Sequence, residues 1–498
     1  MIILAVVVLL LCIYWICWSA RAQRMDRMTS SLPVPPTLPL IGNGTLFMGD
    51  TQQLYKNLCS LAHLAFEHRS AVKIWLGPKL YVAVAGPEDA QVILDNCLDK
   101  DAVYRFMRPW LGHGLFVAPV DLWKTHRKEL LPVFHNKVVE QYLDVVSEQA
   151  SVLIERLGKQ EDQGKFDVLK YITACTLDIM FETAMGERMD VQHSPDTPYL
   201  RARQTVMTIL NMRIFKIWLQ PDFLFNLTHY AKQQKDNIDL THKFTDEVSV
   251  TIKQTKYVVL RNNGKFRAVL DLLFGREIEF TNEQLREHID SITIAGNDTT
   301  ALVIAYTLVL IGMHQEVQEK ILLEQQTIFG TTSRGPSKED LQKMYYLEQV
   351  IKESMRLYTV VPIIARNVEK DIYLPKCGVT LPAGAGAVIG AFAIHRSAAW
   401  GPKPDVFDPD RFLPERSTGR HPATFIPFSY GPRNCIGRNF GMLIMKSIIS
   451  VIVRSYKIEA DEVGPLKLEM LLFPINGHQI KITKRINLSH DNLNNKTL

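Results

Sequence analysis

The sequence predicts a mainly helical protein with a minor β-sheet domain, which is an α+β fold. Amphipathic helical patterns follow one another over residues 135–280, and a further one persists over residues 281–314. Two short runs, residues 72–76 and 80–84, are strand-like. We therefore expect a helical body with a small sheet beside it.

Length and composition fit a large globular chain. It has 498 residues, of which 47% are hydrophobic, and this is ample for a sizeable core. Lysine and arginine number 57 against 52 aspartates and glutamates, so no global basic field indicates binding to nucleic acid. The cysteines are scattered and form no disulfide framework, which fits a reducing compartment.

The N-terminus carries an uncharged apolar run, residues 2–18, at the short end of what spans a bilayer of roughly 30 Å. We predict a retained transmembrane signal anchor over residues 1–20; a cleaved signal peptide is the alternative, but no basic region precedes the run. Prolines crowd the following segment and predict a basic, Pro-rich hinge over residues 21–42, with the main domain over residues 43–498. By the positive-inside rule, three arginines place that domain in the cytosol: Arg21, Arg24 and Arg27.

Residues 122–128 are predicted to be helical, and Trp123 and Arg127 then share one face because they are four apart. Lys124 and Lys128 point away from that face, toward solvent or an acidic electron-transfer partner. An ordinary amphipathic helix with a basic side explains this segment by itself.

Aromatic residues crowd the segment 214–225 around Pro221. A buried helix end is one explanation. A surface patch that enters the same membrane as the anchor is the other, and the sequence favours neither.

The long helical pattern begins at a capping box formed by Thr281 and Gln284, and it is roughly 50 Å long at about 1.5 Å per residue. Its middle, residues 295–300, is poor in helix-forming residues. We expect a kink or widened turn there, which would open a groove for water. The adjacent acid and alcohol, Asp298 and Thr299, could relay protons in that groove; buried polar residues with structural water are the alternative.

Opposite charges lie three residues apart at Glu353 and Arg356, on a predicted helix. Such pairs are common on surfaces and contribute little, so this pattern is weak by itself. Arg411 follows in a Pro-Asp-Arg-Phe run.

The most informative stretch is residues 428–437, in which Cys435 lies among turn-forming residues with Arg433 two positions upstream. A single soft ligand does not suit zinc, and the chain has no Cys-x-x-Cys or His-Glu-x-x-His motif. Haem iron needs only one or two protein ligands. From this cysteine alone, a haem ligand and a buried structural cysteine are evenly matched.

The full spacing Phe428, Gly431, Arg433, Cys435 and Gly437 resembles the haem-thiolate loop of the cytochromes P450. The resemblance covers essentially the whole chain, and it implies that Cys435 is the axial thiolate ligand of the iron. It also implies haem contacts at the positions that match the family's other motifs: Trp123, Arg127, Arg366, Phe428, Arg433 and Gly437.

Two further motifs resemble those of the family. Asp298 and Thr299 match its acid-alcohol pair, which implies monooxygenation, because haem-thiolate isomerases and dehydratases do not need that pair. The charged residues described above match a structural triad of the haem-side core: Glu353, Arg356 and Arg411.

Residues 104–116 and the helix of Trp123 are most similar to the insect family-four branch and its vertebrate fatty-acid hydroxylase relatives. Many of those enzymes have, at the position of Ala295, a glutamate that esterifies the haem, and alanine cannot do so. We therefore expect haem b without a covalent link, and strict terminal hydroxylation of fatty acids is put in doubt.

The resemblance implies a microsomal monooxygenase of the endoplasmic reticulum membrane, with its catalytic domain on the cytosolic face. It would insert one oxygen atom of O2 into a lipophilic substrate, with NADPH-derived electrons from NADPH-cytochrome P450 reductase and cytochrome b5 as a further partner. The chain itself has no dinucleotide-binding glycine motif after a strand. Two alternatives are a haem-thiolate isomerase or dehydratase that needs no reductase, and a non-catalytic membrane-anchored haem- or lipid-binding protein.

Substrate specificity would depend on five chiefly apolar segments. They fit fatty acids, terpenoids and lipophilic foreign compounds alike. These segments are residues 104–118, 205–215, 291–299, 360–365 and 471–476.

Overall fold

The structure is a computed structural model that describes residues 19–259, 268–269, 272 and 280–485, and for residues 248–259 the backbone only. The predicted membrane anchor therefore lies almost wholly outside the described residues. Among these residues one helix, α13 (Asn282–Met313), is long and apolar enough to cross a membrane, but 72% of its apolar window is buried in the protein. It is a core helix.

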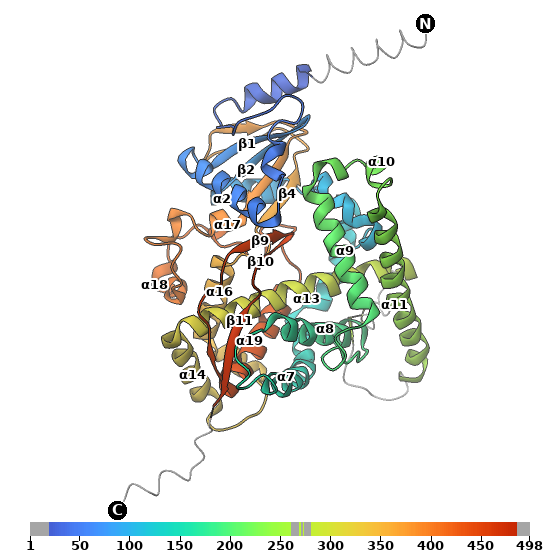
Figure 1. The fold of residues 1–498 in the computed structure, drawn as a ribbon, viewed down its shortest axis with the longest axis vertical. Coiled ribbons are helices and arrows are strands. Elements are labelled where there is room, and N and C mark those ends of the chain that lie inside the picture. Colours follow the sequence, from blue (N-terminus) through green and yellow to red (C-terminus); the bar gives the residue numbers. More distant parts are fainter. Residues whose placement is uncertain (1–18, 260–267, 270–271, 273–279, 486–498) are drawn as a thin grey trace, which may run out of the picture.

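Helices make up most of the fold, and a sheet lies at the end of the molecule nearest the described N-terminus (Figure 1). This arrangement confirms the predicted α+β fold. Besides α13, the longer helices are α2 (Thr51–Glu67), α3 (Pro87–Asn96), α5 (Val120–Leu130), α7 (Leu143–Gly158), α8 (Leu169–Met185), α9 (Pro198–Phe215), α11 (His229–Val259), α14 (Gln315–Phe329), α15 (Lys338–Lys343), α16 (Tyr345–Leu357) and α19 (Arg438–Ser455). Single-turn helices are α4 (Arg108–Leu111), α6 (Asn136–Val139), α10 (Asp222–Phe225), α17 (Ala391–Ile394) and α18 (Pro414–Ser417).

The largest sheet has the strand order β1-β2-β7-β4, and its middle pair, β2 and β7, is parallel while the outer pairs are antiparallel. The runs predicted as strands at residues 72–76 and 80–84 are its first two strands. The bounds are β1 (Ala71–Leu76), β2 (Lys79–Val84), β4 (Ile363–Asn367) and β7 (Gly386–Gly390). Three smaller sheets pair β5 (Ile372–Leu374) with β6 (Val379–Leu381), β9 (Leu466–Glu469) with β10 (Leu471–Pro474), and β11 (Gln479–Lys484) with both β3 (Phe166–Asp167) and β8 (Tyr456–Glu459).

The segment predicted as a hinge, residues 21–42, packs against the largest sheet. Met25 is 4% exposed and packs against sheet residues, and Asp26 accepts a hydrogen bond from Lys73 of β1 at 2.6 Å. Asn43, which is fully buried, donates hydrogen bonds to the carbonyl groups of Pro35 and Pro36 at 2.8 and 3.0 Å.

Helix α13 crosses the middle of the helical body (Figure 1). It begins at the predicted capping box: the Thr281 hydroxyl accepts a hydrogen bond from the Gln284 N–H, and the Gln284 side chain accepts one from the Thr281 N–H. Residues 295–300 are all α-helical, so the expected widened turn is wrong. The Thr299 hydroxyl group donates to the Ala295 carbonyl group at 2.6 Å, a contact that often accompanies a bend of the helix, so the alternative expectation of a kink stays a prediction.

The aromatic segment 214–225 divides between core and surface. Phe225 is 3% exposed and belongs to a small apolar cluster with Leu219 and Ile209. Phe223 and Trp218 are 69% and 49% exposed, so each explanation of this segment fits part of it.

Candidate functional site

The loop that contains Cys435 lies directly before α19, and its backbone is tightly folded. The Cys435 N–H donates a hydrogen bond to the Phe428 carbonyl group at 2.8 Å. Gly431 has a φ of +71°, and a Cβ atom there would lie 2.6 Å from the Leu94 carbonyl oxygen, so only glycine fits. Gly437 leaves space beside the Cys435 sulfur, which would be 4.0 Å from a Cβ atom at that position.

The Cys435 side chain is exposed, yet burial by the surrounding protein raises the pKa of its thiol. Both observations hold when the sulfur faces an internal space of the fold. A hydrogen bond from the backbone of Gly437 and the charges of Arg127 and Arg438 lower the pKa again, and thus favour the thiolate.

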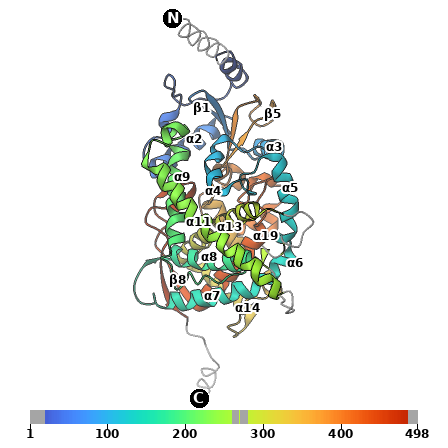
Figure 2. The same ribbon diagram turned by 90° about the vertical axis from the view of Figure 1, so that its right-hand side faces the viewer.

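Trp123 and Arg127, the two residues predicted to share one face of a helix, hold α5 against this loop. Arg127 donates hydrogen bonds to the carbonyl oxygen and the side-chain oxygen of Asn434, at 2.8 and 2.6 Å. Trp123 is 5% exposed, and the guanidinium groups of Arg433 and Arg127 lie 4.5 and 5.8 Å from the centre of its ring. In Figure 2, α5 and α19 lie on one side of α13 and α9 on the other.

Arg433, which lies over Trp123, is close to two further cations, Arg366 of β4 and Lys100, and none of the three forms an ion pair among the described residues, although the charge of Asp99 acts on both arginines. Arg433 donates to the Ala118 carbonyl group at 2.7 Å, but its Nε and Nη1 atoms, and Nε of Arg366, are buried with no hydrogen-bond partner. Burial and the charge of Arg366 lower the pKa of Arg433 to about 10. Such a group of buried like charges is costly unless an anion binds it.

Lys100 is the member of this group that sequence reasoning missed. Its ammonium group lies 3.5 Å from the ring centre of Phe116 and 4.4 Å from that of Tyr104. Burial, followed by the charges of Arg366 and Arg433, lowers its pKa well below the usual value. Lys100 is a single lysine before the 104–116 segment, and no spacing to its neighbours identifies it as a site residue in the sequence.

The acid-alcohol pair lies in the middle of α13, where Ala295 is exposed although most of the helix around it is buried. Ala295 therefore faces an internal space, and the Thr299 hydroxyl group bonds to its carbonyl oxygen. Asp298 instead forms an ion pair at 2.5 Å with Arg203 of α9, whose side chain is 7% exposed. Sequence reasoning missed Arg203, because this partner of Asp298 lies far away along the chain.

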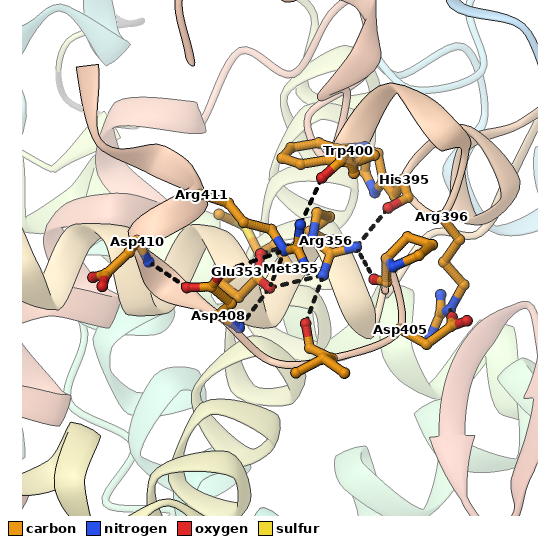
Figure 3. Close-up of polar contacts among 12 residues, drawn as sticks. Glu353, Met355, Arg356, His395, Arg396, Trp400, Asp405, Asp408, Asp410 and Arg411 are labelled. Carbon is orange, nitrogen blue, oxygen red and sulfur yellow. Dashed lines mark hydrogen bonds and ion pairs between the residues drawn. The ribbon is translucent and has the colours of Figure 1, made fainter. Parts of the chain in front are cut away.

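The predicted triad is assembled as expected (Figure 3). Arg356 and Glu353 are fully buried and form two hydrogen bonds of 2.7 Å, and Arg411 approaches the same carboxylate at 3.6 Å. Arg356 also donates to the carbonyl groups of His395 and Pro404 at 2.8 and 2.6 Å. The triad thus joins α16 to the segment that leads to the Cys435 loop.

A comparison with known protein families identifies the family to which a chain with these features belongs. The profile described as Cytochrome P450 matches residues 32–482. The chain belongs to the cytochrome P450 family.

Relatives of this cytochrome P450 support the family-four assignment. It is 36% identical to cytochrome P450 4c3 of Drosophila melanogaster, over 95% of this chain and 93% of that protein. It is 35% identical to cytochrome P450 4V2 of Homo sapiens, over 94% and 92% of the two chains. The haem domain of cytochrome P450DA has the same fold, with a TM-score of 0.80 at 21% identity, over 92% of this chain and 98% of that one. The protein is thus a P450 monooxygenase most similar to the insect and mammalian enzymes of family four.

The residues present fit a haem group. Cys435 offers a sulfur toward an internal space, and Ala295 faces such a space from α13. The buried, unpartnered nitrogen atoms of Arg366 and Arg433 suit the carboxylates of a haem, because charge-assisted hydrogen bonds to carboxylates are strong.

We expect the Lys100→Met protein to lose haem faster than the wild type, by about tenfold or more if one charge-assisted hydrogen bond is removed. The rate is measured by transfer of haem to an excess of apomyoglobin. Lys376→Met is the control, because that lysine is 49% exposed and lies 3.7 Å from Glu88 at the surface. Equal rates of haem loss in the two variants would show that Lys100 does not help to hold the haem.

Proposed function

We propose that this cytochrome P450 is a membrane-bound haem-thiolate monooxygenase of lipophilic compounds that receives NADPH-derived electrons from a reductase. The proposal is supported most by three features of neighbouring elements: the exposed Cys435 sulfur before α19, the buried, unpartnered nitrogen atoms of Arg366 and Arg433, and the acid-alcohol pair on α13, whose next residue, Thr300, lies beside Gly441 of α19. When haem is bound there, it supplies the oxygen-activating chemistry.

In this proposal each site residue has a defined task. Cys435 would ligate the haem iron, and Phe428 and Gly437 shape the loop around its sulfur. Residues of α5, β4, the Cys435 loop and the segment before residue 104 would hold the haem carboxylates: Trp123, Arg127, Arg366, Arg433 and Lys100. No ester link to the haem would form at position 295, because Ala295 stands there.

Proton delivery is the task of Asp298 and Thr299. Burial alone would lower the pKa of Arg203, but the neighbouring Asp298 carboxylate outweighs that effect and raises it, so the guanidinium group stays charged and holds Asp298. Asp298 must therefore leave Arg203 before it can pass a proton toward the Thr299 hydroxyl group. This requirement makes Arg203 a positioning residue of the proposed relay.

An apolar cavity supports the assignment of a lipophilic substrate. It has a volume of about 280 Å³, within reach of the size range of ligand pockets, and lies between α2, the largest sheet and the end of α9. Three of the segments expected to set specificity contribute to its lining through Phe106, Phe215 and Ile363.

The cellular setting is part of the proposal. The anchor over residues 1–20 and the basic segment after it support a place in the endoplasmic reticulum membrane, with residues 43–498 as the catalytic domain on the cytosolic face. NADPH-cytochrome P450 reductase, with cytochrome b5 as a further donor, would then meet the protein at the same membrane.

The Thr299→Ala protein tests the relay. We expect NADPH consumption to continue while product per NADPH falls by about tenfold or more and hydrogen peroxide takes its place, because a positioned proton donor is lost. The measurement uses membranes reconstituted with reductase and a panel of fatty acids, terpenoids and planar foreign compounds, with products located by mass spectrometry. Products that form equally well without NADPH would instead identify an isomerase.

A further inference from the structure

A cluster of buried polar side chains lies on α13 about two turns before Ala295. None of the roles proposed above involves it. His288 of α13 is fully buried, and its ring centre lies 4.4 Å from that of His126 of α5, with the two rings nearly perpendicular at 87°. His126 is 2% exposed. Phe280 covers the pair on one side, with its ring centre 5.1 Å from that of His288.

The polar atoms of this cluster have no protein partner in the part of the chain that the structure describes. They are both ring nitrogens of His288, Nδ1 of His126, and the hydroxyl oxygen of Ser291, which is 4% exposed. Buried polar groups almost always have a hydrogen-bond partner, and where the protein supplies none, ordered water does. Ordered water is therefore the expected partner of these four atoms.

The cluster has the protonation state that a relay needs. Burial, with a smaller effect from His126, lowers the pKa of His288 to about 3, and burial also lowers the pKa of His126. Both imidazoles are therefore neutral at physiological pH. A neutral imidazole has one nitrogen that donates and one that accepts, so it can take up a proton on one side and release another from the other side.

The cluster leads toward the acid-alcohol pair on one face of α13. His288, Ser291, Ala295 and Thr299 are three, four and four residues apart, which places them in one row along the helix. Gly114 allows close approach, since a Cβ atom there would lie 2.3 Å from the Ser291 hydroxyl oxygen. Ala295, with its small side chain, leaves the row open to the internal space.

The outer end of the row reaches the surface through α5. The His126 ring is hydrogen-bonded to the backbone of His113, and His113 is exposed. The His126 end of the cluster therefore lies next to an exposed residue, and the Ser291 end lies toward the middle of α13, on the side of α5.

We propose that His126, His288 and Ser291 hold a water chain that conducts protons from solvent along α13 to the Thr299 hydroxyl group. This route is separate from Asp298 and depends on the proposed monooxygenase function, which consumes protons as one oxygen atom of O2 is inserted into the substrate and the other is reduced to water. Each imidazole gains a proton at one nitrogen and loses one from the other, which leaves it neutral in the opposite tautomer. Proton exchange with the bound water restores the first tautomer before the next transfer.

His478 provides a matched control. It is 1% exposed, both its ring nitrogens lack a partner, burial lowers its pKa to about 3, and its ring packs edge-on against Tyr306 at 4.5 Å. It does not lie in the row on α13. His478→Leu therefore reproduces the loss of a buried, unpartnered imidazole without touching the proposed route.

The first measurement needs no turnover: exchange of the histidine C2 hydrogens with deuterium, followed for each histidine by mass spectrometry in the haem-loaded protein. We expect His288 to exchange several-fold faster than His478, because the proposed water chain connects His288 with bulk solvent. Equal, slow exchange of both would overturn the proposal.

The second measurement uses the reconstituted enzyme. We expect His288→Leu and Ser291→Ala to lower product per NADPH several-fold and to raise the solvent deuterium isotope effect, whereas His478→Leu leaves both near the wild-type values. Ser291→Ala removes one hydroxyl group, so it remains informative if His288→Leu does not fold. Normal coupling in these variants would overturn the route, whereas absence of NADPH-dependent products in the wild type would contradict the monooxygenase itself.

Discussion

Replacing Cys435 by alanine is expected to abolish NADPH-dependent product formation and the red-shifted Soret band of the ferrous carbon-monoxide form. The thiolate is the ligand that produces both, since it pushes electron density toward the iron. No other cysteine lies in the Cys435 loop, so none can replace it. Difference spectra of the purified protein and its circular dichroism measure ligation and folding separately.

Cys175→Ala is the control for that experiment. Cys175 is fully buried in the main apolar core, away from the Cys435 loop, and burial raises the pKa of its thiol out of the physiological range. This variant should keep the thiolate-type spectrum and lose only some stability. A red-shifted band that survives in Cys435→Ala would assign the iron ligand elsewhere.

Replacing Glu353 by glutamine should destabilise the protein by about 3–5 kcal/mol, because it leaves Arg356 buried without a counter-charge and Arg411 with only Asp408, at 4.0 Å. Burial raises the pKa of Glu353, but the two hydrogen bonds from Arg356 oppose that shift and favour the charged form. Urea unfolding followed by circular dichroism measures the loss, which we expect to be accompanied by a lower haem content.

Arg416→Gln is the matched control for the triad. Arg416 forms an exposed ion pair with Asp408 at 2.8 Å, next to the buried network, and exposed pairs of this kind contribute about 1 kcal/mol or less. If the Glu353→Gln and Arg416→Gln proteins unfold at the same urea concentration, the buried triad does not hold this region together.

The features that could be predicted best from the sequence are those set by local patterns. The capping box of Thr281 and Gln284, the strand-like runs of β1 and β2, and the pair of Glu353 and Arg356 are fixed by short spacings, and the structure places them as expected. These features need only helix or strand geometry, or a motif whose members lie in one segment. The widened turn expected at residues 295–300 failed because the long α13 and its neighbours satisfy the polar side chains there.

Partners that are far apart in sequence could not be predicted. Lys100 approaches Arg366 only because β4 and the end of the α3 segment meet, and Arg203 finds Asp298 only because α9 packs across α13. His126 and His288 likewise become neighbours through the packing of α5 on α13. The residues that flank each of them in the sequence form no recognisable motif. Only tertiary packing brings each of them to its partner.

The packed segment before the Pro-rich run decides where the protein should be cut to obtain a soluble form. Arg24 pairs with Asp371 at 2.6 Å, and Asp26 pairs with Lys73, whose side chain is only 7% exposed. Removing these residues would leave a nearly buried lysine without its counter-charge and uncover the apolar surface beneath Met25. A truncated protein that starts near Ser19 should therefore remain monodisperse without detergent, whereas one that starts at Leu32 should aggregate.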